Sequence, residues 1–252
     1  DFNSGLIQGY EALIRGPSDS PLHSPLVLFK VAHQCQLLAE LEMLCRELSI
    51  AAFAAAGVQG DLYLNVNPLL LLSNDHPSGL TLALLDKYQL NPSRVVIELS
   101  EQYQVDDSTV LINAVHHYRE LGFRIAIDDL GSGFSGLKLW SELQPDIVKI
   151  DRYFIDQLHS DPIKKAFVRN IIELAKSTGS LIVAEGIETS EELITCRELG
   201  ADIGQGYLLG RPQVECSKVP LSAIALPMRL SRRSGPPPRP TRSATARFSC
   251  WT

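Results

Sequence analysis

Short apolar runs rich in β-branched residues recur along the chain and predict seven strands. The predicted strands are Leu6–Ile14, Leu62–Val66, Val95–Leu99, Ile125–Ile127, Ile147–Ile150, Leu181–Val183 and Ile203–Leu208. Segments with helical periodicity lie between them. The predicted helices are Pro25–Ala56, Leu80–Tyr88, Ser108–Leu121, Gly136–Leu143, Pro162–Ser177 and Ser190–Leu199. This alternation of strands and helices indicates a parallel α/β protein.

Polar residues at the strand ends distinguish between two parallel architectures. Each predicted strand delivers a carboxylate, amide or lysine at or near its C-terminal edge, namely Glu11, Asn65, Glu98, Asp128, Lys149, Glu185 and Gln205. In a doubly wound sheet, ligand groups gather at one switch point, whereas in a barrel every strand ends at one shared mouth. The pattern favours a TIM-like (β/α)8 barrel. An eighth strand is then expected, and we place it before residue 1.

Composition divides the chain into two parts. The 252 residues are 45% hydrophobic and carry a net charge of -6. Six arginines and no acid follow residue 228, so residues 1–228 hold 17 basic and 29 acidic residues. We assign residues 1–228 to the barrel. The Pro-, Arg- and Ser-rich residues 229–252 are expected to be a tail without regular structure. A solvated tail is the simpler interpretation than a polybasic contact site.

Several functional classes find no support in the sequence. The five cysteines have no zinc-site or disulfide-framework spacing, which favours a reducing, cytoplasmic compartment. The six histidines end no predicted strand, and no G-x-S-x-G nucleophile motif occurs. The chain has no apolar run of membrane-spanning length, and its acidic balance argues against DNA binding. The remaining candidate chemistry depends on carboxylates, amides and one lysine.

Gly131, Gly133 and Gly136 match the dinucleotide-binding pattern G-x-G-x-x-G. However, Asp128 and Asp129 stand directly before them and would repel a pyrophosphate at short range. Adjacent carboxylates at a strand end instead suit Mg²⁺ or Mn²⁺, which prefer oxygen ligands. Each acid taken alone could be a surface or turn residue. Taken together, acids that end apolar runs are costly to bury without a cation, so we expect a metal site.

The ordered motifs resemble those of the EAL domain family. They are Tyr10–Arg15 (YEALIR), Leu64–Pro68 (LNVNP), Glu98–Glu101 (ELSE), Asp128–Leu137 (DDLGSGFSGL), Val148–Asp151 (VKID), Ala184–Glu188 (AEGIE) and Gln205–Tyr207 (QGY). The resemblance implies a (β/α)8 barrel that hydrolyses cyclic di-GMP to linear pGpG. It also implies Mg²⁺ or Mn²⁺ as cofactor, with two ions expected.

The resemblance also implies a role for each matching residue. The expected metal ligands are Glu11, Asn65, Glu98, Asp128 and Asp129, the last shared with or holding the second ion. The expected catalytic residues are Glu185, which completes the metal–water centre, Lys149, which holds the attacking water, and Gln205, which orients water. The expected substrate contacts are Leu13 and Arg15. The expected supporting residues are Glu101, Asp151 and Glu188, of which Glu101 and Glu188 steady the glycine loop.

This sequence departs from the family pattern in places. Relatives carry a strand with a Gln-Pro pair before the signature, whereas here the chain begins after it. Leu130 and Phe134 stand where Phe and Tyr are common, and Gly136 stands where Ser is usual. Two alternatives remain, a cyclic di-GMP receptor without catalysis and a different magnesium-dependent barrel enzyme. The resemblance further suggests a homodimer through the glycine-loop region and a GGDEF or sensor domain in the full-length protein.

Overall fold

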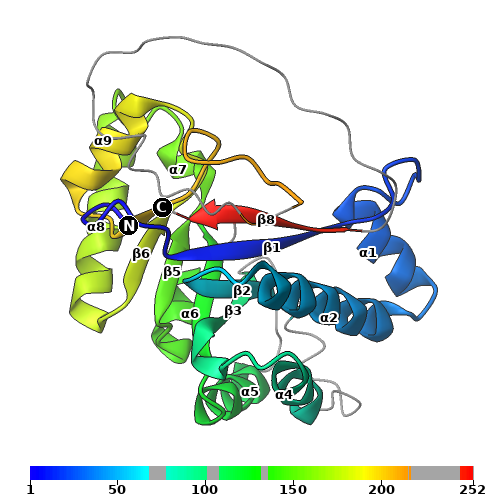
Figure 1. Ribbon diagram of the computed structural model, residues 1–252. Helices are drawn as coiled ribbons and strands as arrows, with labels where there is room; N and C mark the ends of the chain where they lie inside the picture. The colour runs from blue at the N-terminus through cyan, green and yellow to red at the C-terminus, as the bar shows by residue number, and fades with distance from the viewer. Residues whose placement is uncertain (68–77, 101–107, 132–135, 215, 217–244, 252) are drawn as a thin grey trace.

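The computed structural model describes residues 1–67, 78–100, 108–131, 136–214, 216 and 245–251. Eight strands form one sheet (Figure 1). They are β1 (Gly9–Arg15), β2 (Asp61–Asn65), β3 (Val95–Ser100), β4 (Arg124–Leu130), β5 (Ile147–Ile150), β6 (Leu181–Ala184), β7 (Ile203–Gly204) and β8 (Thr245–Trp251). All seven predicted strands are therefore present, and β8 was not anticipated.

The sheet has the strand order of a barrel. Strands β1 to β7 follow one another in sequence order, and every neighbouring pair among them is parallel. A doubly wound sheet would reverse its order at a switch point, and none occurs among these strands. The TIM-like α/β class is thus confirmed. Within the described residues no ladder joins β7 to β8, so these two strands are the ends of the sheet.

The helices that follow the strands are α1 (Pro25–Gln34), α2 (Leu38–Ala56), α4 (Ser78–Lys87), α5 (Ser108–Glu120), α6 (Gly136–Leu143), α7 (Arg152–Ile155), α8 (Pro162–Thr178) and α9 (Ser190–Leu199), with a 3-10 turn η1 at Pro92–Arg94. The predicted helix Pro25–Ala56 is two helices, because Gln36 adopts a left-handed φ of 59° that interrupts helical hydrogen bonding. The short α7 was not predicted. Among the described helices, none is long and apolar enough to cross a membrane.

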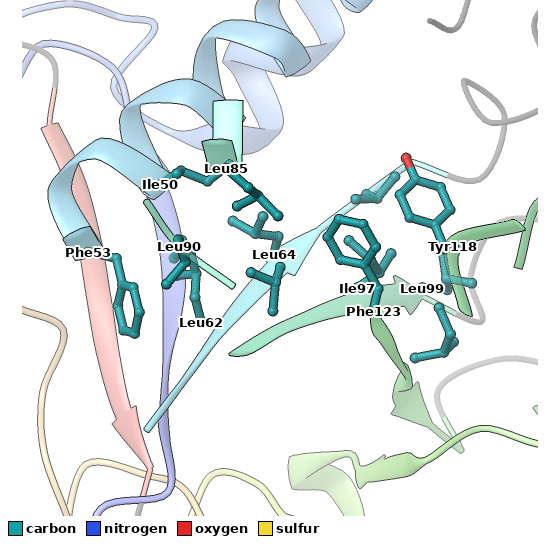
Figure 2. Close-up of a cluster of buried hydrophobic side chains, with 14 of the residues drawn as sticks. Ile50, Phe53, Leu62, Leu64, Leu85, Leu90, Ile97, Leu99, Tyr118 and Phe123 are labelled. Atoms are coloured by element: carbon teal, nitrogen blue, oxygen red, sulfur yellow. The ribbon is translucent and has the colours of Figure 1, made fainter. Parts of the chain in front are cut away.

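Two apolar clusters hold the helices on the sheet. The first lies between α2, α4 and α5 and the first strands, as Figure 2 shows for Phe53, Leu62, Leu85 and Ile97. The second joins α6, α8 and α9 to β4, β5 and β6. Each fully buried large aliphatic or aromatic side chain contributes about 1.5–3 kcal/mol by leaving water. These clusters fix the positions of the strand ends, where the polar residues stand.

The C-terminal segment differs from expectation where the structure describes it. Residues 245–251 form β8, which runs antiparallel to β1 on its outer side (Figure 1). The expected lack of regular structure is therefore wrong for these seven residues. The rest of the predicted tail, residues 229–244 and 252, lies outside the described residues. Within the described residues, the eighth strand of the sheet is β8, from the C-terminal part of the chain. The strand expected before residue 1 lies outside this sequence and stays a prediction.

Candidate active site

The structure brings the predicted strand-end residues together at one end of the sheet. Glu11 lies on β1, Asn65 ends β2, Glu98 lies on β3, and Asp128 lies on β4. Lys149 lies on β5, and Glu185 and Gln205 directly follow β6 and β7. Because the strands are parallel, the carboxyl ends of β1 to β7 open on the same side, as in other barrel proteins.

Lys149 is the centre of the cluster, and its side chain is 1% exposed. Its ammonium nitrogen lies 2.7 Å from Glu98 Oε1, 2.7 Å from Asp128 Oδ1 and 2.8 Å from Glu185 Oε1. Glu11 Oε2 is 3.7 Å away. One buried cation thus faces four carboxylates, three on strands β1, β3 and β4 and one directly after β6, and the group retains an excess of negative charge.

Two amides fix the carboxylate of Glu11. Asn65 Nδ2 donates to Glu11 Oε1 at 3.0 Å, and Gln205 Nε2 donates to Glu11 Oε2 at 2.8 Å. Both oxygens therefore have a defined orientation, set by residues 54 and 194 positions away in the chain. The amide oxygens of Asn65 and Gln205 keep lone pairs that could bind a cation or water.

A bulge explains how two consecutive aspartates reach the same site. The register between β4 and β5 shifts between Ile127 and Leu130, and Asp129 has a left-handed φ of 57°. In a regular strand Asp128 and Asp129 would point to opposite faces, but a bulge redirects one side chain. Gly131 follows with a φ of 102°, and a Cβ there would collide with the ring of Phe154. Only glycine suits this position.

Burial and like charge alter the acidities in the cluster. Burial raises the pKa of Glu98 and of Glu185 well above the usual range, despite the opposing effect of Lys149. Burial, followed in magnitude by the negative charge of Asp128, raises the pKa of Asp129 to about 6. Burial opposes the charge of Lys149, but the four carboxylates together raise its pKa well above the usual value. A divalent cation would favour the ionised carboxylates and offset this cost.

The donor set fits divalent cations. Oxygens of Glu11, Glu98 and Asp128 lie within 4.8 Å of one another, and so do oxygens of Asp128, Asp129 and Glu185. Asp128 belongs to both groups, so two neighbouring ions could share it. In the described part of the chain, Glu98 Oε2 is buried and has no hydrogen-bond partner. A buried oxygen of this kind is costly unless a ligand binds it, and oxygen ligands suit Mg²⁺ and Mn²⁺.

Cavities open beside the cluster. One of about 340 Å³ is lined by Leu13, Arg15, Asp129, Lys149 and Glu185, and also by Asp151, Arg152, Glu188, Gln205 and Tyr207. A second of about 510 Å³ extends from Glu98 and Asp128 towards α1 and α2, where Phe29 and Glu42 line it. The carboxylates thus lie between the two cavities, and a ligand larger than either cavity could occupy both.

The predicted supporting residues have mixed positions. Asp151 caps α7 by accepting from the backbone N–H of Tyr153 at 2.7 Å. Glu188 pairs with Arg152 at 2.8 Å, and its expected contact with the glycine loop involves residues outside the described part of the chain. Glu101 also lies outside the described residues.

Sequence reasoning missed two residues that face the cavities. Arg152 pairs with Glu188 beside Glu185, and its place directly after the Val-Lys-Ile-Asp motif was the available signal. Glu42 is a buried acid on α2, 4.0 Å from Arg46. An acid within an apolar helical stretch could have identified it.

The chain is similar in sequence to a known family and to proteins within it. The sequence model of the EAL domain matches residues 1–212. The cyclic di-GMP phosphodiesterase PdeF of Escherichia coli K12 is 30% identical over 209 residues, which is 81% of this chain and 28% of PdeF. The chain therefore spans less than a third of that relative.

Solved structures resemble the fold. The EAL enzyme Bd1971, bound to cAMP and cyclic di-GMP, has a TM-score of 0.75 and 28% identity, covering 84% of this chain and 59% of that one. A manganese and cyclic di-GMP complex of Klebsiella pneumoniae BlrP1 has a TM-score of 0.70 and 29% identity. That match covers 79% of this chain and 50% of the BlrP1 chain.

Proposed function

Because the chain belongs to the EAL domain family, we propose that it hydrolyses cyclic di-GMP to linear pGpG with two Mg²⁺ or Mn²⁺ ions. The observation that supports this most strongly is the pair of carboxylate groups that share Asp128. Two-ion centres of phosphodiester hydrolysis need such a bridging ligand, since their ions lie about 3.5–4 Å apart. PdeF is named a phosphodiesterase for this nucleotide, which supports the substrate assignment.

In this proposal Glu11, Asn65, Glu98 and Asp128 hold one ion, and Asp128, Asp129 and Glu185 hold the second. Bound ions would lower the pKa of a shared water and neutralise charge that develops on the phosphate. The buried Glu98 Oε2 supplies a ligand atom that has no other partner in the described part of the chain. Gln205 orients Glu11 through the 2.8 Å hydrogen bond and presents its own oxygen to water.

Lys149 holds the attacking water and offsets phosphate charge. Its ammonium also keeps Glu98, Asp128 and Glu185 in place through contacts of 2.7–2.8 Å. Since the carboxylates keep its pKa high, Lys149 remains a cation at neutral pH and acts as a donor, not as a base. The proton of the attacking water would then pass to a neighbouring carboxylate, for which Glu185, 2.8 Å from the Lys149 ammonium, is suitably placed.

Leu13 and Arg15 contact the nucleotide in this proposal. Both line the 340 Å³ cavity together with Glu185 and Gln205. The guanidinium of Arg15 would pair with a substrate phosphate, which its fixed positive charge and planar donors suit. Asp151 and Glu188 support this wall of the cavity through α7 and Arg152. Glu101 keeps its expected supporting role in the proposal.

The same family membership supports four wider proposals. Residues 1–228 form the catalytic domain, and residues 229–252 form an extension. A homodimer forms through the region around the glycine loop, next to Phe154, which packs on Gly131. The full-length protein carries a GGDEF or sensor domain and works in the cytoplasm.

The test is incubation of the chain with cyclic di-GMP and Mn²⁺ or Mg²⁺, followed by chromatographic separation of products. We expect pGpG in the presence of either ion and none after chelation with EDTA. Binding of cyclic di-GMP without any pGpG would contradict the hydrolase and indicate a receptor. Turnover of another substrate but not of cyclic di-GMP would indicate a different barrel enzyme.

A further inference from the structure

Arg152 lies against the backbone beside the metal-site carboxylate Glu185. It is the first residue of α7, two positions after β5 ends at Ile150. Its aliphatic stem covers Gly186, where a Cβ would lie 2.6 Å from Arg152 Cβ and 2.5 Å from Arg152 Cγ. The close contact with this glycine holds the stem in place, and Arg152 lines the 340 Å³ cavity.

The guanidinium of Arg152 is free to bind a ligand in addition to its present partner. Nη1 lies 2.8 Å from Glu188 Oε1, and the two side chains are 53% and 37% exposed. An ion pair in contact with water contributes little to stability, because water screens both charges. The five N–H donors of a guanidinium also allow Arg152 to keep Glu188 and to bind an anion at the same time.

Arg15 lies across the mouth of the sheet from Arg152. It ends β1, whereas Arg152 follows β5, and β2, β3 and β4 lie between these two strands. Strands four positions apart stand on opposite sides of an eight-stranded barrel. Both arginines nevertheless line the same cavity of about 340 Å³. One ligand in this cavity can therefore meet a fixed cation on each side.

The charge of the cavity makes a second free cation important. Six carboxylates line it, together with Arg15, Lys149 and Arg152. Lys149 is buried and already contacts three carboxylates at 2.7–2.8 Å. Divalent ions would neutralise the carboxylates of the metal site, but Asp151 and Glu188 lie outside that set. An anionic group beside these two acids would be repelled unless Arg152 offset their charge.

We propose that Arg152 binds the second phosphate of the cyclic dinucleotide, the one that Arg15 does not contact. The proposal rests on the proposed function for the identity of the ligand, but not for its hydrolysis. A cyclic dinucleotide carries two phosphodiesters on opposite sides of its ring, and each has one negative charge. Two arginines on opposite sides of one cavity fit this arrangement. Arg152 thus selects ligands with two phosphodiesters over linear ligands with one.

Binding of cyclic di-GMP and of linear GpG tests this assignment, because GpG has the same bases but one phosphodiester. Titration calorimetry with Ca²⁺ in place of Mn²⁺ measures both dissociation constants, and chromatography checks that the nucleotides stay intact. We expect Arg152→Met to weaken binding of cyclic di-GMP by at least about 10-fold and that of GpG by less than about 2-fold. Equal losses for the two ligands would indicate a contact with a base and overturn the proposal, as would unchanged binding of cyclic di-GMP.

A double variant separates a direct contact from neutralisation of Glu188. If Arg152 only cancelled the charge of Glu188, Arg152→Met combined with Glu188→Gln would bind cyclic di-GMP as tightly as Glu188→Gln alone. We expect the double variant to remain at least about 10-fold weaker than Glu188→Gln. Arg152→Lys should recover part of the affinity, since it keeps the charge but loses the planar donors. Restored binding in the double variant would overturn the proposal.

Two matched substitutions serve as controls. Arg169→Met removes an exposed arginine on α8 that lines neither of the two cavities. It should change both dissociation constants by less than about 2-fold, because screening weakens distant exposed charges. Lys30→Met removes a lysine that lines the 510 Å³ cavity and should leave the preference for cyclic di-GMP over GpG unchanged. Loss of that preference in Lys30→Met but not in Arg152→Met would overturn the assignment to Arg152.

Kinetics distinguish a failure of this proposal from a failure of the proposed function. With Mn²⁺, we expect Arg152→Met to raise KM for cyclic di-GMP by at least about 10-fold and to change kcat by less than about 3-fold, because the lost contact is equally present before and during the reaction. A full chain that binds cyclic di-GMP without producing pGpG contradicts the hydrolysis, but its dissociation constants still decide the role of Arg152. A full chain that hydrolyses cyclic di-GMP with the same KM in Arg152→Met supports the function and overturns the role of Arg152.

Discussion

Lys149 concentrates the electrostatics of the site in one side chain. It is buried with three carboxylate oxygens within 2.8 Å, so the ion-free site depends on its charge. Removing one partner of a buried ionic network leaves the other charges without compensation, which costs about 3–5 kcal/mol.

We therefore expect Lys149→Met to lower the free energy of unfolding by about that amount without metal. Added Mn²⁺ should stabilise Lys149→Met more than the wild type, because the ions replace the missing positive charge. Thermal denaturation with and without Mn²⁺ measures both effects. Lys138→Met is the matched control, since Lys138 is 71% exposed, and should change stability by less than about 0.5 kcal/mol. Equal effects of the two variants would contradict the role of Lys149.

Glu42 provides a prediction on pH. Burial raises its pKa to about 7 from 4.5, against the lowering effects of Arg46 and the Asn67 backbone. Between these values the folded state binds more protons at Glu42 than the unfolded state, so stability falls as pH rises. Glu42→Gln lacks this titration. Its free energy of unfolding should therefore rise relative to that of the wild type by up to about 3 kcal/mol between pH 4.5 and 7. Urea unfolding at several pH values measures the difference in free energy of unfolding between the two proteins. A difference that does not change with pH would contradict the raised pKa of Glu42.

At the residue scale, the sequence predicted which side chains meet but not how. The strand-end positions of Glu98 and Glu185 followed from the apolar runs before them. The contacts of Lys149 with four carboxylates did not, because they depend on barrel stagger. The left-handed backbone of Asp129 was equally invisible, since Asp adopts this conformation only in particular surroundings.

At the scale of elements, the bulge in β4 and the turn at Gly131 define the edge of the site. Gly131 combines a positive φ with close approach to Phe154, whereas Gly179 has a positive φ and open space around it.

Gly179→Ala should cost about 1 kcal/mol for backbone strain alone. Gly131→Ala should cost distinctly more, about 2–4 kcal/mol, because Phe154 must also move. Chemical denaturation measures the two free energies of unfolding. Similar losses in the two variants would show that the contact with Phe154 is unimportant.

Element boundaries were predictable where a local signal marks them. Gly136–Leu143 and Ser190–Leu199 have the bounds that the sequence predicts. The break between α1 and α2 at Gln36 has no glycine or proline to announce it, so the apolar pattern suggested one helix. The strand β8 was missed because its pairing with β1 depends on contact between the two ends of the chain, which no local pattern records.

At the scale of the whole molecule, the acidic cluster couples metal binding to protons. Burial and Asp128 raise the pKa of Asp129 to about 6, and burial raises the pKa of Glu98. Metal ligation requires the ionised carboxylates, so each bound ion displaces protons at low pH.

We expect the affinity for Mn²⁺ to rise from pH 5 to pH 7, with more protons released per ion at pH 5.5 than at pH 8. Titration calorimetry in two buffers of different ionisation enthalpy measures the released protons. Asp129→Asn should release fewer protons at pH 5.5 than the wild type. An affinity that is independent of pH would contradict the raised acidities.

The order of the parallel strands was predictable because each apolar run and each helix carries its own signal. The antiparallel strand β8 was not predictable, since alternation of strands and helices does not reveal an antiparallel strand from a distant segment.

The number of Mn²⁺ ions that the full chain binds tests the proposed two-ion centre most directly. Titration calorimetry measures this number, with Asp128→Asn as the comparison. Two ions per chain, with binding of both weakened by at least about 10-fold in Asp128→Asn, are predicted because Asp128 belongs to both carboxylate groups. No bound Mn²⁺, or binding that Asp128→Asn leaves unchanged, would contradict a two-ion hydrolytic centre at this site.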